Sequence, residues 1–160
     1  MLKHFFTAIL TSAVLMLPGC MATGPAFQEA TAPSTGESLV YVYRPAGLVL
    51  AVYDANFFVD GKELVHLANN GYTKTYLSAG RHLIMQRWFD SMVSAALLGL
   101  TARKIELAVD AKAGGTQYFR FSTGTGNPGY GITLAWRLEQ VSPEIGAAEI
   151  AKMKYQPAKI

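Results

Sequence analysis

From Ser38 onwards the sequence is a series of short segments rich in β-branched and aromatic residues, separated by turn residues. Segments of this kind, bounded by glycine, proline, asparagine or aspartate, are typical of β-strands. Their spacing of about 8–12 residues, mostly without helices between them, predicts an antiparallel sandwich or barrel of about eight strands. The expected strands are 39–44, 56–59, 62–67, 72–77, 81–89, 103–109, 117–122 and 132–138.

Two turns between these strands have sequences that specify their geometry. Asp60-Gly61 is a hairpin signal, and Ala79-Gly80 joins the next two strands along the chain. Glycine at these points fits backbone conformations with positive φ, which other residues adopt with strain.

Two segments interrupt the strand pattern. Residues 91–100, SMVSAALLGL, predict a short helix or a mobile loop. If buried, which we favour, the segment caps an open end of the fold, and if exposed it is a patch for a partner or a bilayer surface. The second segment is a C-terminal helix from 143 to about 154. Ser142 is its expected N-cap and Pro143 its first residue. Ile145 and Ala148 are expected to pack on the sheet. Lys152 and Lys154 are expected to lie in the last turn, where cations suit the helix dipole.

The N-terminus predicts export. Lys3 precedes an apolar stretch at 5–17, and about 13 residues are too few for a helix that spans a bilayer. This length suits the central region of a secretory signal peptide. The following residues, Leu17, Pro18, Gly19 and Cys20, resemble the lipobox of bacterial lipoproteins.

That resemblance implies a lipid anchor. The signal peptide 1–19 would be removed and Cys20 would carry a diacylglyceryl thioether and an N-acyl chain such as palmitate. Met21 is not the aspartate that retains lipoproteins in the inner membrane, which implies the outer membrane, facing the periplasm. Residues 20–37 lack an apolar period and predict a flexible tether, followed by a sandwich domain at 38–142 and a helix and tail at 143–160.

Composition narrows the class of protein. Of the 160 residues, 51% are hydrophobic and 16% are charged, which favours a folded domain over disorder. The net charge of +3 comes from scattered residues, so nucleic acid is not an expected partner. The one cysteine excludes a disulfide within the chain and a zinc site of several thiolates.

Six stretches between Leu39 and about Lys154 form a recognisable series: 40–45 (VYVYRP), 58–62 (FVDGK), 67–72 (LANNGY), 77–82 (LSAGRH), 115–120 (GTQYFR) and 138–142 (LEQVS). In these stretches the chain resembles domain-of-unknown-function family 2846, found in bacterial lipoproteins, and it shares a pattern with PEGA-like β-sandwich modules. The resemblance implies a β-sandwich in the cell envelope and provides no catalytic residues.

Candidate chemical groups are few. Residues 124–129 fit G-x-G-x-x-G formally, but the predicted strand after them argues against a dinucleotide site and for a loop between strands. His66 and His82 are expected to be structural, because no third metal ligand is singled out among Asp54, Asp60 and Asp90. We therefore expect no enzyme activity, no cofactor and no metal.

The aromatic residues are numerous for a core of this size, and they fill the sandwich or form a stacking platform for sugar rings. They are Tyr41, Tyr43, Tyr53, Tyr72, Tyr76, Trp88, Tyr118, Tyr130 and Trp136.

The expected function is a lipid-anchored, non-catalytic binding or structural module that contacts another envelope protein, through a sheet edge or the 91–100 segment. The alternative is a protein that binds cell-wall or surface glycan through its tyrosines.

Overall fold

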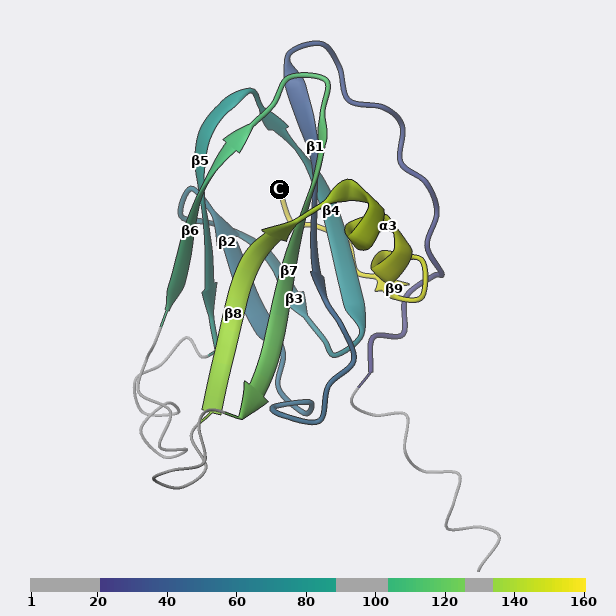
Figure 1. Cartoon of the computed structure of the whole chain (residues 1–160), viewed down its shortest axis with the longest axis vertical. Helices are drawn as coiled ribbons and strands as arrows, with labels where there is room; N and C mark the ends of the chain where they lie inside the picture. Colours follow the sequence, from purple (N-terminus) through teal and green to yellow (C-terminus); the bar gives the residue numbers. More distant parts are fainter. Residues whose placement is uncertain (1–20, 89–103, 126–133) are drawn as a thin grey trace, which may run out of the picture.

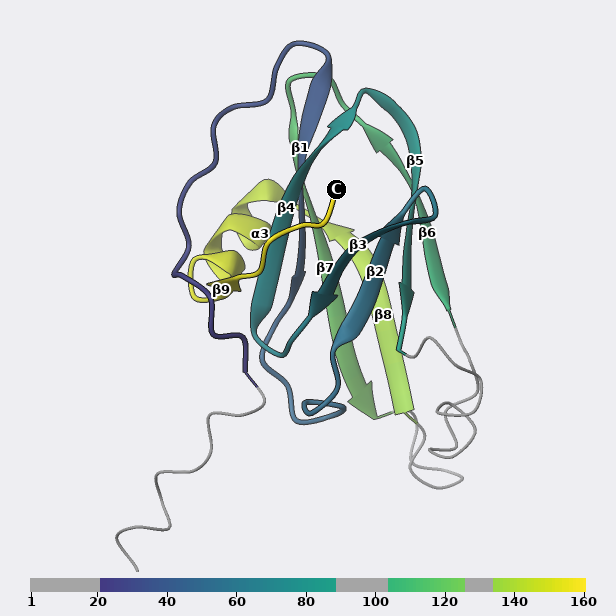
Figure 2. The same cartoon turned by 180° about the vertical axis from the view of Figure 1, so that it is seen from behind.

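The structure is a computed structural model that describes residues 21–88, 104–125 and 134–160. Leu17, Pro18, Gly19 and Cys20, the residues of the predicted lipobox, lie outside these residues, as does the 91–100 segment. The described chain forms two β-sheets packed face to face and one short helix, so the mainly β sandwich expected from the sequence is confirmed (Figures 1 and 2).

The smaller sheet has four strands in the order β3-β2-β5-β6, and all of its pairs are antiparallel. Its strands are β2 (Ala55–Val59), β3 (Lys62–Leu67), β5 (Gly80–Arg87) and β6 (Ile105–Ala111). The β2–β3 hairpin turns at Asp60 and Gly61, whose φ values of 49° and 80° match the predicted Asp-Gly turn. Gly80 has φ 136°, which explains the glycine at the β4–β5 turn.

The larger sheet has five strands in the order β8-β7-β1-β4-β9. They are β1 (Glu37–Arg44), β4 (Gly71–Ser78), β7 (Thr116–Thr125), β8 (Leu134–Val141) and β9 (Lys154–Tyr155). Two pairs differ from the antiparallel expectation, because β1 runs parallel to β7 and β4 runs parallel to β9. Alternating apolar residues determine which face of a strand is buried, but they do not determine its neighbour or its direction.

Strand β1 is buried on both of its faces. Val40 and Val42 belong to the core between the two sheets, together with residues such as Phe57 and Phe121. Leu39, Tyr41 and Tyr43 point to the other side of the sheet and belong to a second apolar cluster. The larger sheet therefore carries a third layer on its outer face, which the unbroken apolar run of β1 requires.

Helix α3 (Pro143–Ile150) forms part of this third layer (Figure 1). The predicted start is confirmed, since the Ser142 side chain accepts a hydrogen bond from the Ile145 backbone and Pro143 opens the helix. The predicted end at 154 is wrong: the helix stops at Ile150 because residues 154–155 pair with β4, so Lys152 and Lys154 lie beyond its last turn.

The buried face of α3 also differs from the expectation. Gly146 and Ile150 are buried, whereas Ile145 and Ala148 are exposed. A Cβ atom on Gly146 would lie 2.3 Å from Cγ of Tyr118, so glycine is what allows the helix to approach the sheet this closely.

Residues 21–36, which we call the strap, form the rest of the third layer, and the prediction of a flexible tether over 20–37 is wrong for them. The strap runs along the outer face beside β9 and α3 before it enters β1 (Figures 1 and 2). Met21 forms a β-bridge with Asn69, and Ala26 forms one with Lys154. An extended segment held by backbone hydrogen bonds and one aromatic side chain needs no apolar period, which is why the composition suggested a free linker.

Candidate functional site

A pocket of about 530 Å³ lies between the strap, the outer face of the larger sheet and helix α3. Three separate parts of the chain therefore build it. The residues that line it are Phe27, Glu29, Ala30, Ala32 and Pro33 from the strap, Leu39, Tyr41, Thr116 and Tyr118 from β1 and β7, Gly114 from the turn before β7, and Ala147 from α3.

Two tyrosines form one side of this strap pocket. Tyr41 and Tyr118 are direct neighbours in the parallel β1–β7 register, and their rings stack with centroids 5.0 Å apart and an angle of 6°. Burial raises the pKa of Tyr41 to about 12, and the neighbouring Tyr118 adds to the effect. Burial also raises the pKa of Tyr118, with a further contribution from Glu29. Both hydroxyls are therefore neutral at physiological pH.

The charge of the strap pocket is set by one group. Its lining includes the Glu29 carboxylate and no lysine, arginine or histidine among the described residues. Aromatic and aliphatic walls with a single acid favour an apolar guest with a neutral or basic polar group over an anionic one. An apolar or basic side chain of a protein partner has these properties.

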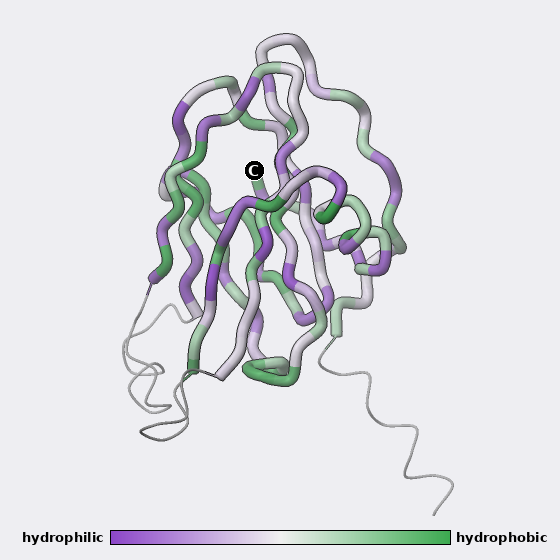
Figure 3. The backbone as a smooth tube through the Cα atoms, viewed as in Figure 1, coloured by the Kyte–Doolittle hydropathy of each residue, from purple (hydrophilic) through white to green (hydrophobic). Residues whose placement is uncertain are grey.

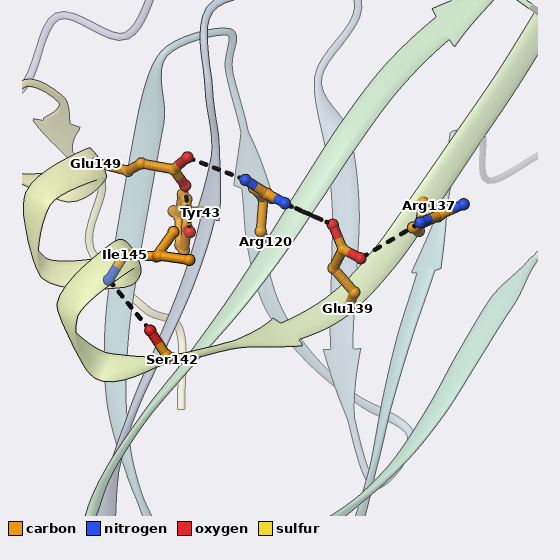
Figure 4. Close-up of polar contacts among 7 residues, drawn as sticks. All are labelled: Tyr43, Arg120, Arg137, Glu139, Ser142, Ile145 and Glu149. Carbon is orange, nitrogen blue, oxygen red and sulfur yellow. Dashed lines mark hydrogen bonds and ion pairs between the residues drawn. The ribbon is translucent and has the colours of Figure 1, made fainter.

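A chain of polar contacts holds α3 beside the pocket (Figure 4). The Tyr43 hydroxyl donates a hydrogen bond to Glu149 Oε2 at 2.5 Å, and Arg120 reaches Glu149 Oε1 at 3.0 Å and Glu139 Oε1 at 2.8 Å. Burial raises the pKa of Tyr43, the hydrogen bond to Glu149 raises it further, and the hydrogen bond to Glu139 raises the pKa of Arg120. These groups are tied to one another across β1, β7, β8 and α3, so they position the helix.

Asp60, Ser78 and His82 meet at the opposite end of the sandwich from the β1–β2 loop. His82 Nδ1 lies 2.6 Å from Asp60 Oδ2, and His82 Nε2 lies 2.8 Å from the backbone oxygen of Ser78. Both ring nitrogens face acceptors, which requires a hydrogen on each and favours the imidazolium ion. Ser78 Oγ is 3.5 Å from Nε2, but a nitrogen that donates to a carbonyl cannot accept the serine proton. The group is a clasp between two turns and lacks the geometry of a catalytic triad.

This clasp predicts a pH-dependent stability. The hydrogen bond to Asp60 raises the pKa of His82 above 6.5. The contribution of His82 to the stability of the fold is therefore fully present below pH 6.5 and is lost as pH rises through the folded-state pKa. The same contact lowers the pKa of Asp60 below 3.8, so its contribution is lost as acidification passes the folded-state value. We expect His82→Gln to lower the free energy of unfolding between these pH values. The loss should be only about 1 kcal/mol, because water screens the half-exposed Asp60 carboxylate.

Urea unfolding of wild type and His82→Gln across this range measures the effect, with Asp60→Asn as the matched variant. The stability difference should shrink as the pH becomes alkaline. A difference that stays constant from acid to alkaline pH would contradict the charged clasp.

The other groups singled out in the sequence lie apart. His66 pairs with Glu63 at 2.7 Å on the surface, and across the described ranges no three His, Cys, Asp or Glu side chains gather as a metal site. Gly124 lies within β7, paired with Ala135, and residues 126–129 of the G-x-G-x-x-G stretch lie outside the described part. In that described part no helix is long and apolar enough to cross a bilayer.

Most of the aromatic residues fill the two apolar clusters. Trp88 and Trp136 pack with the core between the sheets, and Tyr41, Tyr43, Tyr72 and Tyr118 belong to the outer cluster. Tyr76 is 40% exposed, with its hydroxyl bonded to Thr31 of the strap, and Tyr130 lies outside the described residues. Tyr72 and Tyr76 thus hold the strap, and the tyrosines among the described residues that line the pocket are Tyr41 and Tyr118. The sequence did not predict this pocket, because no local motif marks a cavity made by three segments.

Comparison with known families places the chain. The model of a family described as "Protein of unknown function (DUF2846)" matches residues 34–131, from the end of the strap to beyond β7. The chain belongs to this family. The stretches that suggested it include Asp60 and His82, which the fold brings into contact as the clasp. No curated protein and no solved structure matches the chain.

Proposed function

We propose that this chain is a lipid-anchored protein of the bacterial cell envelope, held in the outer membrane and facing the periplasm. Its sandwich is a non-catalytic binding module, and the strap pocket receives an apolar or basic side chain of another envelope protein. The pocket is the observation that carries the binding role, because its walls come from three segments held in place by separate contacts.

The anchor is supported by the sequence before the strap. Leu17-Pro18-Gly19-Cys20 resembles a lipobox, and Cys20 is the one cysteine of the chain. Three acyl chains on this residue would make dissociation from a membrane negligible, since each buried methylene contributes about 0.8 kcal/mol.

The non-catalytic role is supported by how the described polar groups are used. His82 has acceptors on both ring nitrogens, and Arg120 is shared between Glu139 and Glu149. Each of these groups joins two elements of the fold, so a substrate would have to displace a structural contact to reach it.

Site-specific photo-crosslinking in intact cells tests the binding role. A photoreactive phenylalanine analogue at Ala147, which lines the pocket, should join the chain to one envelope protein. The matched control is Ala148, the next exposed residue of α3, which is not part of the lining. Ala147→Trp should fill the mouth of the pocket and abolish copurification of that protein, whereas Ala148→Trp should preserve it. Equal crosslinking at both positions, or none at either, would contradict binding in the pocket.

A glycan is the second candidate guest, because Tyr41 and Tyr118 offer aromatic surface on which a sugar ring can pack. Glycan binding in the pocket predicts that the wild-type protein and the Ala148→Trp variant sediment with isolated peptidoglycan and that the Ala147→Trp variant does not. A crosslinked product that lysozyme converts to a smaller species would identify the glycan as the occupant.

A further inference from the structure

The loop between β1 and β2 presents two apolar side chains to solvent. Residues 45–54 read PAGLVLAVYD, in which Asp54 is the one charged residue. Leu48 is 97% exposed and Val52 is 67% exposed, the two highest values among the exposed large hydrophobic residues of the described chain. In Figure 3 this loop is the green stretch at the lower end of the sandwich.

The loop is held in one conformation. Arg44 donates to the backbone oxygens of Tyr53 at 2.6 Å and Leu50 at 2.7 Å, and Thr123 Oγ1 donates to the oxygen of Val49 at 2.9 Å. Leu50 has φ 56°, a left-handed conformation that is strained for leucine and is maintained by these contacts. The exposure of Leu48 and Val52 therefore belongs to a fixed structure.

The same end of the sandwich holds the start of the strap. Asn69 forms hydrogen bonds with the backbone N–H and C=O of Gly47 at 3.0 Å each, and its side chain also contacts Met21 Sδ at 3.4 Å. The backbone oxygen of Asn69 accepts from Ala22 at 2.8 Å. One buried residue thus joins the first residues of the strap to the base of the loop.

Cys20 is bonded directly to Met21, so their Cα atoms are separated by about 3.8 Å. A free linker over 20–37 would have allowed the sandwich to move about 20–25 Å from its anchor. With Met21 fastened to Asn69, an anchor at Cys20 brings this end of the sandwich to the lipid surface.

We propose that the β1–β2 loop is a membrane-contacting element, which inserts Leu48 and Val52 into the interfacial layer of the bilayer that holds the Cys20 acyl chains. This inference rests on the proposed lipid anchor. An apolar loop tip beside acyl chains loses water contact on insertion, and the loop is already ordered, so little conformational entropy opposes the insertion. The acyl chains on Cys20 and the β1–β2 loop then orient the module on the membrane together, and the strap pocket and α3 remain on its flank.

Fluorescence of lipidated full-length protein in vesicles tests the proposal. A Leu48→Cys variant, purified from membranes and reconstituted in vesicles of phosphatidylethanolamine and phosphatidylglycerol, is labelled with an environment-sensitive dye. A lipid-modified Cys20 has no free thiol, so the dye reports position 48 alone. The matched control is Ile145→Cys on α3, since Ile145 is an apolar residue that is 48% exposed.

The expected result is blue-shifted emission at position 48 and quenching by nitroxide-labelled lipids several-fold stronger than at position 145. Equal, weak quenching at both positions, on protein whose intact mass includes the acyl chains, would overturn the membrane contact and leave the anchor standing. Protein whose mass lacks acyl chains would overturn the proposed anchor and this inference together. Protection of position 48 from a soluble thiol reagent in cells, without lipid quenching in vesicles, would identify a protein occupant and also overturn the membrane contact.

Discussion

Arg44→Met is expected to lower the free energy of unfolding by about 3 kcal/mol or more. Arg44 is 1% exposed, and its guanidinium donates to the backbone oxygens of Tyr53, Leu50 and Leu67. It also lies 5.2 Å from the ring centre of Trp88. Methionine fills a similar volume but leaves these oxygens without their donor, and the β1–β2 loop loses its support.

The charge of Arg44 persists in the folded protein. Burial lowers its pKa to about 10, partly offset by Asp54, so the side chain remains a cation at neutral pH. Arg44→Lys should recover little of the loss, because an ammonium group cannot reproduce the planar fork that reaches all three backbone oxygens at once. Urea unfolding followed by tryptophan fluorescence measures the change. Stability of Arg44→Met within about 1 kcal/mol of wild type would contradict this role.

Gly24→Ala is expected to detach the strap from the sandwich. A Cβ atom at residue 24 would lie 1.7 Å from the backbone oxygen of Tyr155, and a backbone atom cannot move aside as the end of a side chain can. The hydrogen bond from Tyr155 N–H to Pro25 O is then lost, and Phe27 loses its contacts with Tyr41 and Tyr72. We expect a cost of about 2 kcal/mol or more.

Gly36→Ala is the matched control, because no atom lies within 4 Å of a Cβ at that position. Hydrogen exchange should show loss of protection at the Ala22 and Tyr155 amides in Gly24→Ala and unchanged protection in Gly36→Ala. Limited proteolysis should cleave within residues 21–36 faster in Gly24→Ala than in Gly36→Ala. Equal protection in the two variants would mean that the strap is not seated as described.

The sequence predicted local features of the fold well. Short β-branched and aromatic segments bounded by turn residues identified the strands, Asp60-Gly61 identified a hairpin, and Ser142-Pro143 identified the start of α3. These features depend on a few neighbouring residues, so they can be read directly from a local pattern.

The features that the sequence did not predict depend on distant residues. The parallel β1–β7 pair and the end of α3 at Ile150 are decided by which strand is available as a neighbour. The strap has the composition of a linker, and its order comes from Phe27 packing on tyrosines of β1 and β4. For the same reason the strap pocket and the Asp60–His82 clasp could be recognised only after folding, although the motifs containing Asp60 and His82 were visible in the sequence.

The intact mass of the protein purified from the membrane fraction tests the central claim of a lipid-anchored module most directly. The proposed lipobox predicts a chain that begins at Cys20 and carries a diacylglyceryl group and an N-acyl chain, and Cys20→Ala should lose both the cleavage and the added mass. A chain that retains residues 1–19, or one with an unmodified Cys20, would contradict the anchor and the membrane-facing orientation derived from it.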